Sequence, residues 1–382
     1  EMTPYLRLTG AQVLRPDGLD DAPLSISAGR IVDMGGREVD LSGFLVLPGI
    51  VDAHGDAFEK HLAPRRGAMK DLDQGLVATE AELAANGITT ATLAQFYSWE
   101  GGMRGPAFAR QVFTALQQIR PRLGTDIRPQ LRFEFSMVDE YDAVLDMVAR
   151  FDIRYVVFND HLPHEALEAG KRPPRLTGQA LRIGKNPEKH LADLQALYSG
   201  LDAVPDALAL LMPMLAERGV LMGSHDDHTR ADRALWHGRG ALVAEFPETV
   251  EAAEAAKATG DAVVLGAPNL VRGGSHKGNV SALDLVAMGL CDALASDYHY
   301  PSMRRAAFLL ADGGVMSFAA AWGLISDGPA RMLGLADRGR LTPGMRADLV
   351  VLDAARREIC ATLSGGQVTY MKGEAAARFL AS

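Results

Sequence analysis

The sequence predicts an α/β protein in which eight parallel strands and their helices form a barrel, accompanied by a small β-domain built from both termini. Three observations predict this fold. Residues 48–340 alternate short apolar strands with Ala-, Leu- and Glu-rich helical stretches, as parallel barrels do. Residues 1–47 and 341–382 instead contain short strands punctuated by Gly and Asp, which is typical of antiparallel sheet. The length of 382 residues suits one large barrel with an appendage.

The two ends of the chain share one character. Alternating segments near the N-terminus predict strands over 6–9, 11–14, 24–26 and 31–34. Near the C-terminus, apolar runs predict strands over 347–353 and 366–371. We therefore expect 1–47 and 341–382 to combine into one β-domain, with 48–340 inserted as a continuous barrel domain.

The middle of the chain supplies eight candidate barrel strands. They cover 49–54, 88–93, 131–135, 155–159, 220–224, 241–245, 262–265 and 293–296. Helical stretches between them end at Gly87 and Gly260, and a Gly just past a periodic segment is a helix stop signal. An open, doubly wound sheet is the alternative that this pattern leaves.

Composition and charge exclude several classes of function. With 39 Lys and Arg against 48 Asp and Glu, the net charge is −9, which disfavours nucleic acid and anionic membranes as partners. Two cysteines, Cys291 and Cys360, cannot build a disulfide framework or a cysteine-rich zinc site. No apolar run approaches the roughly 20 residues of a membrane span, and no secretory signal is visible. We expect a cytoplasmic protein.

Ionisable residues stand at the ends of five predicted strands. In a parallel barrel these ends form the active-site face, and His54 and Asp56 point the same way because they are two residues apart on an extended segment. The others are Glu134, His161, His225 and Asp297. Each alone has an ordinary structural explanation, but their convergence predicts a site for one or two divalent ions, with zinc the expected metal.

The metal hypothesis assigns roles to these six residues. His54 and Asp56 would anchor one ion, His161 and His225 the second, and Glu134 would bridge or share. Asp297 would contact the metal-activated water and act as the catalytic general base. His164, His228 and His276 remain possible substitute ligands.

Basic and small residues predict an anionic substrate. Gly-rich residues 266–279 follow the seventh strand, and such residues suit phosphate oxygens. The candidate substrate-binding residues are Lys60, His61, Arg65, Arg272, Ser275, His276 and Lys277. The basic stretch 165–202 is either a solvated surface insertion or a cationic lid.

The segments 47–54 (LPGIVDAH) and 341–353 (LTPGMRADLVVLD) resemble the metal-dependent amidohydrolase superfamily. That resemblance covers nearly the whole chain and implies a (β/α)8, TIM-like barrel beside a β-sandwich. Common members have His-x-His on the first strand, whereas this chain has Asp56 at the second position.

Further segments point to a narrower branch. Residues 54–65, 224–227, 266–269, 272–276 and 296–298 are similar to the diphosphatases of phosphonate metabolism, in the carbon–phosphorus lyase pathway. This implies hydrolysis of a phosphorylated sugar, α-D-ribose 1-methylphosphonate 5-triphosphate, to the 5-phosphate and pyrophosphate. It also implies a homodimer. The alternatives are an amidohydrolase acting on a C–N bond, such as a deaminase or cyclic amidase, and a non-catalytic scaffold that keeps the fold.

Overall fold

The computed structural model describes residues 3–63, 71–273 and 278–381. Two compact units divide the chain. The first comprises 1–93, 118–128 and 262–382, and the second comprises 94–117 and 129–261.

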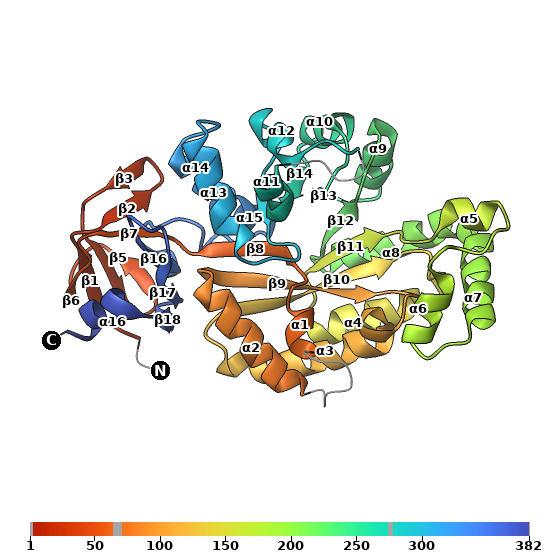
Figure 1. Ribbon diagram of the computed structural model, residues 1–382, viewed down its shortest axis with the longest axis horizontal. Coiled ribbons are helices and arrows are strands. Elements are labelled where there is room, and N and C mark those ends of the chain that lie inside the picture. Colours follow the sequence, from red (N-terminus) through yellow and green to blue (C-terminus); the bar gives the residue numbers. More distant parts are fainter. Residues whose placement is uncertain (1–2, 64–70, 274–277, 382) are drawn as a thin grey trace. The chain divides into compact units, whose positions relative to one another are not determined.

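Strands from both ends of the chain share a sheet in the first unit (Figure 1). One sheet has the order β5-β4-β1-β6 and the other β18-β17-β16-β7-β2-β3. Their bounds are β1 Leu6–Thr9, β2 Gln12–Arg15, β3 Gly18–Asp20, β4 Leu24–Ser27, β5 Arg30–Val32, β6 Arg37–Asp40, β7 Phe44–Pro48, β16 Leu349–Asp353, β17 Ile359–Ser364 and β18 Gln367–Met371. The antiparallel pair β7–β16, with Leu349 opposite Pro48, joins the two ends of the sequence.

The two sheets share one apolar core. Leu6 and Leu8 from the first sheet and Val46 and Leu349 from the second belong to the same buried cluster. Burial on facing surfaces of two sheets is the arrangement of a β-sandwich. The C-terminal helix α16 (Gly373–Leu380) contributes to this core through Phe379.

The other eight strands form a parallel sheet in the order β15-β14-β13-β12-β11-β10-β9-β8. Their bounds are β8 Ile50–Gly55, β9 Ile88–Tyr97, β10 Asp126–Glu134, β11 Tyr155–Asn159, β12 Leu221–His225, β13 Val243–Glu245, β14 Ala262–Gly266 and β15 Ala293–Ala295. A bridge between Gly55 and Asp297 brings the two edge strands together, so the barrel is nearly closed. All eight predicted strands are confirmed, and the open-sheet alternative is wrong.

Helices of the first unit follow or precede its strands. They are α1 Glu59–Leu62, α2 Leu72–Ala85, η2 Arg120–Arg122, α11 Ala267–Arg272, α12 Ala282–Ala287, α13 Ser302–Asp312, α14 Phe318–Gly323 and α15 Asp327–Met332. Asp71 caps α2 by accepting a hydrogen bond from the Gln74 N–H, which satisfies one free donor of the first turn. Residues 267–272, part of the Gly-rich stretch 266–279, form α11, and Gly273 directly after it adopts the left-handed conformation.

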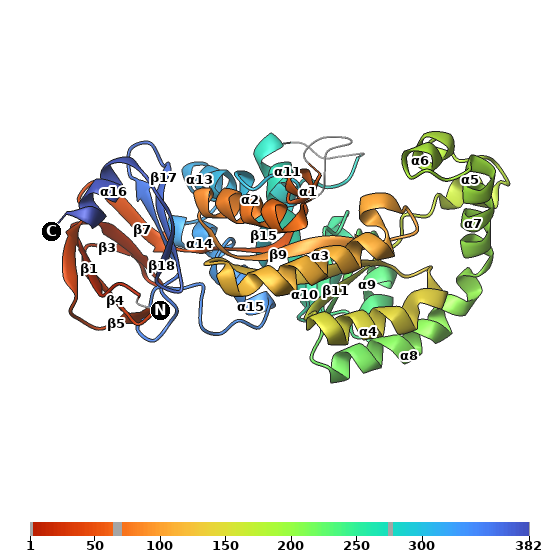
Figure 2. The same ribbon diagram turned by 90° about the horizontal axis from the view of Figure 1, so that it is seen from below.

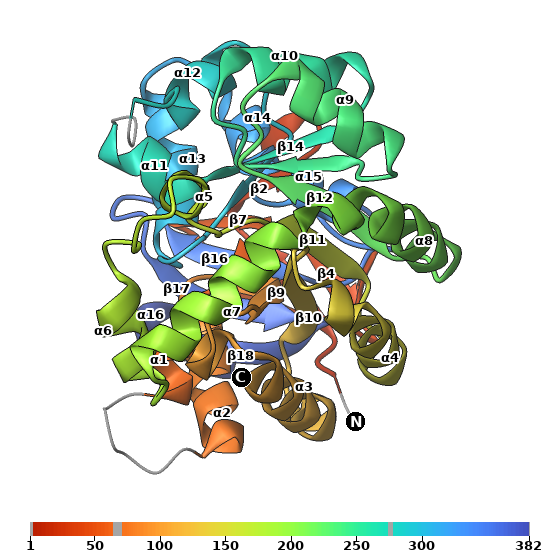
Figure 3. The same cartoon turned by 90° about the vertical axis from the view of Figure 1, so that its right-hand side faces the viewer.

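Helices of the second unit include α3, α4 and α8, which lie along the outside of β10 and β11 (Figure 3). The full set is η1 Gly102–Arg104, α3 Pro106–Ile119, η3 Val138–Glu140, α4 Tyr141–Phe151, α5 His164–Glu168, α6 Leu176–Arg182, α7 Pro187–Ser199, η4 Leu201–Ala203, α8 Val204–Glu217, α9 Arg230–Gly238 and α10 Val250–Ala258. Thr229 and Asp232 form a reciprocal capping box at the start of α9.

The basic stretch 165–202 is a helical insertion rather than a long loop. Its helices α5, α6 and α7 are grouped together (Figure 2). Leu162, Leu167, Leu176 and Leu194 give them a small core of their own, against which Trp99 packs. Asn186 caps α7 and Pro187 occupies its first turn, so the local sequence specifies where this helix begins.

Among the described residues, no single helix is long and apolar enough to cross a membrane. One bent pair, Pro187–Ser199 with Leu201–Glu217, meets the criteria of length and composition only.

Candidate active site

Three of the predicted site residues come together in the first unit. His54, in β8, is fully buried. The Asp297 N–H donates to the His54 carbonyl at 2.9 Å, and the Asp56 N–H donates to the Asp297 carbonyl at 2.8 Å. These backbone hydrogen bonds tie the end of the first barrel strand to the end of the eighth, and so bring the imidazole and the two carboxylates to one edge.

A buried carboxylate that the sequence analysis missed supports this arrangement. Asp52, on β8, is fully buried. It accepts hydrogen bonds from the Ser296 N–H at 2.9 Å, from the Ser296 hydroxyl, and from the His54 N–H at 3.3 Å. Burial raises the pKa of Asp52, although these hydrogen bonds oppose the shift. Asp52 thus ties the backbone of His54 to that of Ser296, the residue before Asp297. An acidic residue inside an apolar strand was the available signal.

In the second unit, Glu134 and His161 meet a third residue, Glu100. One ligand atom from each lies within 4.8 Å of the others. The His161 Nδ1 is 2.8 Å from Glu100 Oε1 and 3.1 Å from Glu134 Oε1. Glu100 lies in the segment after β9, whose path the sequence does not reveal, and it was not predicted.

The protonation of this cluster follows from burial and charge. Burial raises the pKa of Glu134 to about 7. For Glu100, burial opposes ionisation, but His161 and Arg104 outweigh it and lower its pKa to about 2. The pKa of His161 is raised, because its hydrogen bond to Glu100 and the charge of Glu134 exceed the cost of burial. Both shifts favour an ion pair between His161 and Glu100.

Two further groups donate hydrogen bonds to the Glu134 carboxylate. Its Oε2 accepts hydrogen bonds from the Trp99 indole at 3.1 Å and from the His161 backbone N–H at 3.0 Å. Its Oε1 is buried and has no hydrogen bond among the described residues. The carboxylate is thus oriented through one oxygen while the other faces His161.

His225 is oriented by another acid that the sequence analysis did not select. The Nδ1 of His225 is 3.2 Å from Glu245 Oε1. The other oxygen of Glu245 accepts hydrogen bonds from Tyr155 at 2.7 Å and Gln130 at 3.1 Å. The His225 Nε2 lies 3.5 Å from the Arg132 guanidinium, which stacks over Phe96. Glu245 therefore favours the tautomer with a proton on Nδ1, which leaves the lone pair of the imidazole on Nε2.

Unusual backbone conformations follow these strands. Asp226 and Phe246, directly after β12 and β13 in the second unit, have φ of 59° and 53°. Asp297, after β15 in the first unit, has φ of 55°. Left-handed backbone is uncommon for residues other than Gly and is costly for a bulky one such as Phe. Such strain clusters at functional sites.

The predicted substrate-binding residues are only partly described. Lys60 and His61, on α1, both contact Glu82, at 2.7 and 2.5 Å. Arg272, at the end of α11, is exposed. Arg65, Ser275, His276 and Lys277 lie outside the described residues.

Two alternative ligands have other surroundings. His164 contacts Asp160 at 2.6 Å and is exposed. His228 is also exposed. Neither belongs to the group formed by Glu100, Glu134 and His161. Asp227, part of a segment that carries the family resemblance, instead contacts the buried Arg233 at 3.1 Å.

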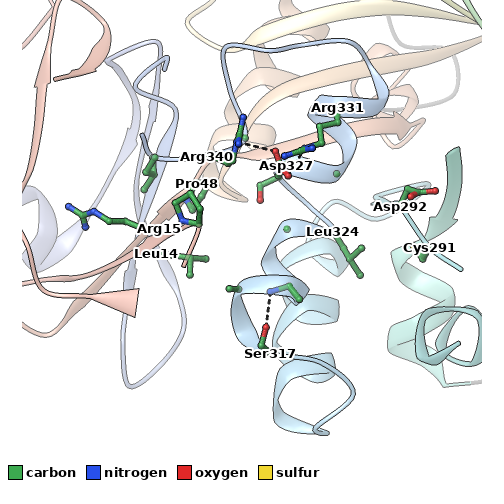
Figure 4. A pocket seen from close by; sticks show the side chains of 18 residues that line it. Leu14, Arg15, Pro48, Cys291, Asp292, Ser317, Leu324, Asp327, Arg331 and Arg340 are labelled. Atoms are coloured by element: carbon green, nitrogen blue, oxygen red, sulfur yellow. Dashed lines mark hydrogen bonds and ion pairs between the residues drawn. The ribbon is translucent and has the colours of Figure 1, made fainter. Parts of the chain in front are cut away.

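A pocket of about 580 Å³ in the first unit contains none of the predicted site residues (Figure 4). Arg331 and Arg340 line it, and both contact Asp327, at 2.8 and 3.3 Å.

The residues present fit a divalent cation. Glu100, Glu134 and His161 supply carboxylate oxygen and imidazole nitrogen within a compact group, and these are ligands that zinc and related ions accept. Glu134 Oε1 is buried, has no hydrogen bond among the described residues and lies 3.1 Å from His161 Nδ1, so a bound cation would stabilise its negative charge.

Comparison with known proteins gives both sequence and fold relatives. The Amidohydrolase family profile matches residues 285–370. Alpha-D-ribose 1-methylphosphonate 5-triphosphate diphosphatase of Escherichia coli (strain K12) is 33% identical over 335 residues, which cover 82% of this chain and 84% of that protein.

Two solved structures share the fold. N-acyl-D-glutamate deacylase from Bordetella bronchiseptica, complexed with zinc and a phosphonate inhibitor, has a TM-score of 0.61 and 15% identity, with 97% of each chain covered. N-acetylglucosamine-6-phosphate deacetylase from Pasteurella multocida has a TM-score of 0.63 and 9% identity, covering 95% of this chain and 99% of that one. The barrel fold, the family profile and the identity to the E. coli diphosphatase lead to one conclusion. The chain belongs to the amidohydrolase superfamily.

Proposed function

We propose that this protein is a metal-dependent hydrolase of phosphonate catabolism. Its substrate would be α-D-ribose 1-methylphosphonate 5-triphosphate, and its products the 5-phosphate and pyrophosphate. The observation that carries the proposal is the 33% identity to the E. coli diphosphatase across 82% of the chain. Members of the amidohydrolase superfamily generally bind divalent metals, and the carboxylate and imidazole group around His161 suits such an ion.

The proposed metal ligands are those at the strand ends, with zinc as the expected ion. His54 and Asp56 would hold one ion, and Glu134, His161 and His225 would hold a second. Asp297 would be a further ligand and the general base. Glu100 joins the proposed ligands because its carboxylate reaches the same nitrogen of His161 as Glu134 does. A bound divalent ion supplies hydroxide at neutral pH, because it lowers the pKa of water to about 7.

The remaining residues would manage protons and charge. Asp297 accepts the proton of the attacking water, which general-base catalysis requires. Lys60, His61, Arg65, Arg272, Ser275, His276 and Lys277 are the proposed contacts to the triphosphate. Their donors would stabilise negative charge that develops on the departing pyrophosphate, which is the main task in phosphoryl transfer.

The test is a product assay with purified protein loaded with Zn²⁺ or Mn²⁺. We expect pyrophosphate to be released from α-D-ribose 1-methylphosphonate 5-triphosphate and release to stop when the metal is removed by a chelator. Ammonia release from deaminase and cyclic-amide substrates is measured in parallel. Ammonia without pyrophosphate would replace this proposal with C–N hydrolysis, and protein that binds no divalent metal would contradict both.

A further inference from the structure

Asn159, the last residue of β11, has a side chain with unusual surroundings. Its side chain is buried, with 1% of the residue exposed. Neither the amide oxygen nor the amide nitrogen has a hydrogen-bond partner among the described residues. Its backbone carbonyl accepts a hydrogen bond from the Phe135 N–H at 3.2 Å.

The strand register places Asn159 between two proposed metal ligands. Glu134 pairs with Asn159 across β10 and β11. Phe158 pairs with Ser224 across β11 and β12, so the next residues along, Asn159 and His225, are level with each other. Side chains at the same level of adjacent parallel strands point to the same face and lie about 5 Å apart. Glu134, Asn159 and His225 therefore form one row.

This arrangement destabilises the folded protein unless a group binds the Asn159 amide. A buried polar group without a hydrogen bond costs roughly 1–3 kcal/mol. An apolar residue would avoid that cost, and Val157, two residues earlier on the same face of β11, shows that the strand accepts one. The presence of an amide at this position is explained if its polar atoms contact a bound ligand that the metal-free protein lacks.

We propose that the Asn159 amide oxygen, Oδ1, binds the divalent cation that Glu134 and His225 are proposed to hold. The inference rests on the proposed metal-dependent function and adds a ligand that neither the sequence motifs nor the comparisons assign. A neutral amide suits this position because the same row already contains Glu134 and, paired with His225, Glu245. A third carboxylate there would add repulsion, whereas an amide oxygen adds a ligand without charge.

The test separates metal binding from folding. Metal-free wild type, Asn159→Leu and Asn159→Asp are titrated with Mn²⁺ and with Zn²⁺ by calorimetry, and the thermal unfolding midpoint of each metal-free protein is recorded. Asn159→Leu should bind metal at least about tenfold more weakly, yet unfold at the same temperature as the wild type or a higher one. Asn159→Asp, which keeps a ligand oxygen, should bind within about tenfold of the wild type.

Gln130 provides the matched control for folding. It is a buried amide on β10, but its side chain donates to Glu245 at 3.1 Å. Gln130→Leu should therefore lower the unfolding midpoint, in contrast to Asn159→Leu.

The outcomes separate the two proposals. Unchanged metal affinity in Asn159→Leu would overturn the role of Asn159 and leave the proposed function standing. Equal loss of affinity in both Asn159 variants would overturn the assignment of Oδ1 as the ligand. A wild type that binds neither ion would defeat the proposed function itself.

Discussion

At the scale of single residues, Asp297 is the sharpest test of the chemistry. Asp297→Asn should lower kcat by about 10²–10⁴-fold, because the amide cannot accept the proton that a general base must take. Asn also tolerates the left-handed backbone that Asp297 adopts, with φ of 55°, so the fold should persist. Steady-state kinetics and metal content by elemental analysis check this. Loss of metal in step with loss of activity would show that Asp297 acts mainly as a ligand.

Glu245 offers a residue-scale test of how an imidazole is oriented. Glu245→Gln keeps the size of the side chain but removes the charge that faces His225 Nδ1 at 3.2 Å. Metal affinity should fall by about 10–100-fold, as expected when the acid behind a ligating histidine is lost. Calorimetric titration measures this. Tyr155→Phe removes only one hydrogen bond to Glu245 and should have a smaller effect. An affinity equal to that of the wild type in Glu245→Gln would rule out the orienting role.

At the scale of elements, Arg233 on α9 holds the turn that follows β12. Its guanidinium donates to Ser224 at 2.6 Å, Asp227 at 3.1 Å and Asp261 at 2.5 Å. Arg233→Ala should lower the free energy of unfolding by about 3–5 kcal/mol, because it leaves buried carboxylates without their cation. Urea denaturation measures the loss. Arg230→Ala, at an exposed position of the same helix, should change stability by less than about 0.5 kcal/mol, and equal losses in the two variants would contradict the argument.

Element positions were largely readable from the sequence, whereas side-chain partners were not. The apolar runs located all eight barrel strands. In the β-domain, β3 and β6 were missed because such short, polar strands carry little apolar signal, and the apolar strands β7 and β17 were missed as well. Backbone hydrogen bonds join the segments that carry His54, Asp56 and Asp297, and the expected role of these residues as metal ligands stays a prediction. Glu245 lay inside a predicted strand, yet its direction was hidden because strands buried on both faces show no alternation of polar and apolar residues.

At the scale of the whole molecule, the stability of the first unit should depend on pH through Asp126. Burial would raise the pKa of Asp126, but Arg128 and Arg338 outweigh it and hold that pKa below its usual value. A depressed pKa stabilises the folded state above the unfolded pKa of about 3.9, and this contribution disappears as the pH falls through the folded pKa.

The Asp126→Asn variant tests this dependence. It should be less stable than the wild type by roughly 1.5–3 kcal/mol at pH 7, and the difference should shrink below about pH 4. Chemical denaturation across pH 3–8 measures it, with the exposed Asp202→Asn as the control. A difference that stays constant down to pH 3 would contradict the electrostatic explanation.

The position of Trp99 has an optical consequence. Its indole donates to Glu134 on one side, and its ring lies 6.0 Å from that of His190 in α7 on the other. The emission of this fluorophore therefore responds both to what happens at Glu134 and to displacement of α7. The protein thus carries an intrinsic reporter between the proposed metal ligand Glu134 and the helical insertion, readable without any attached dye.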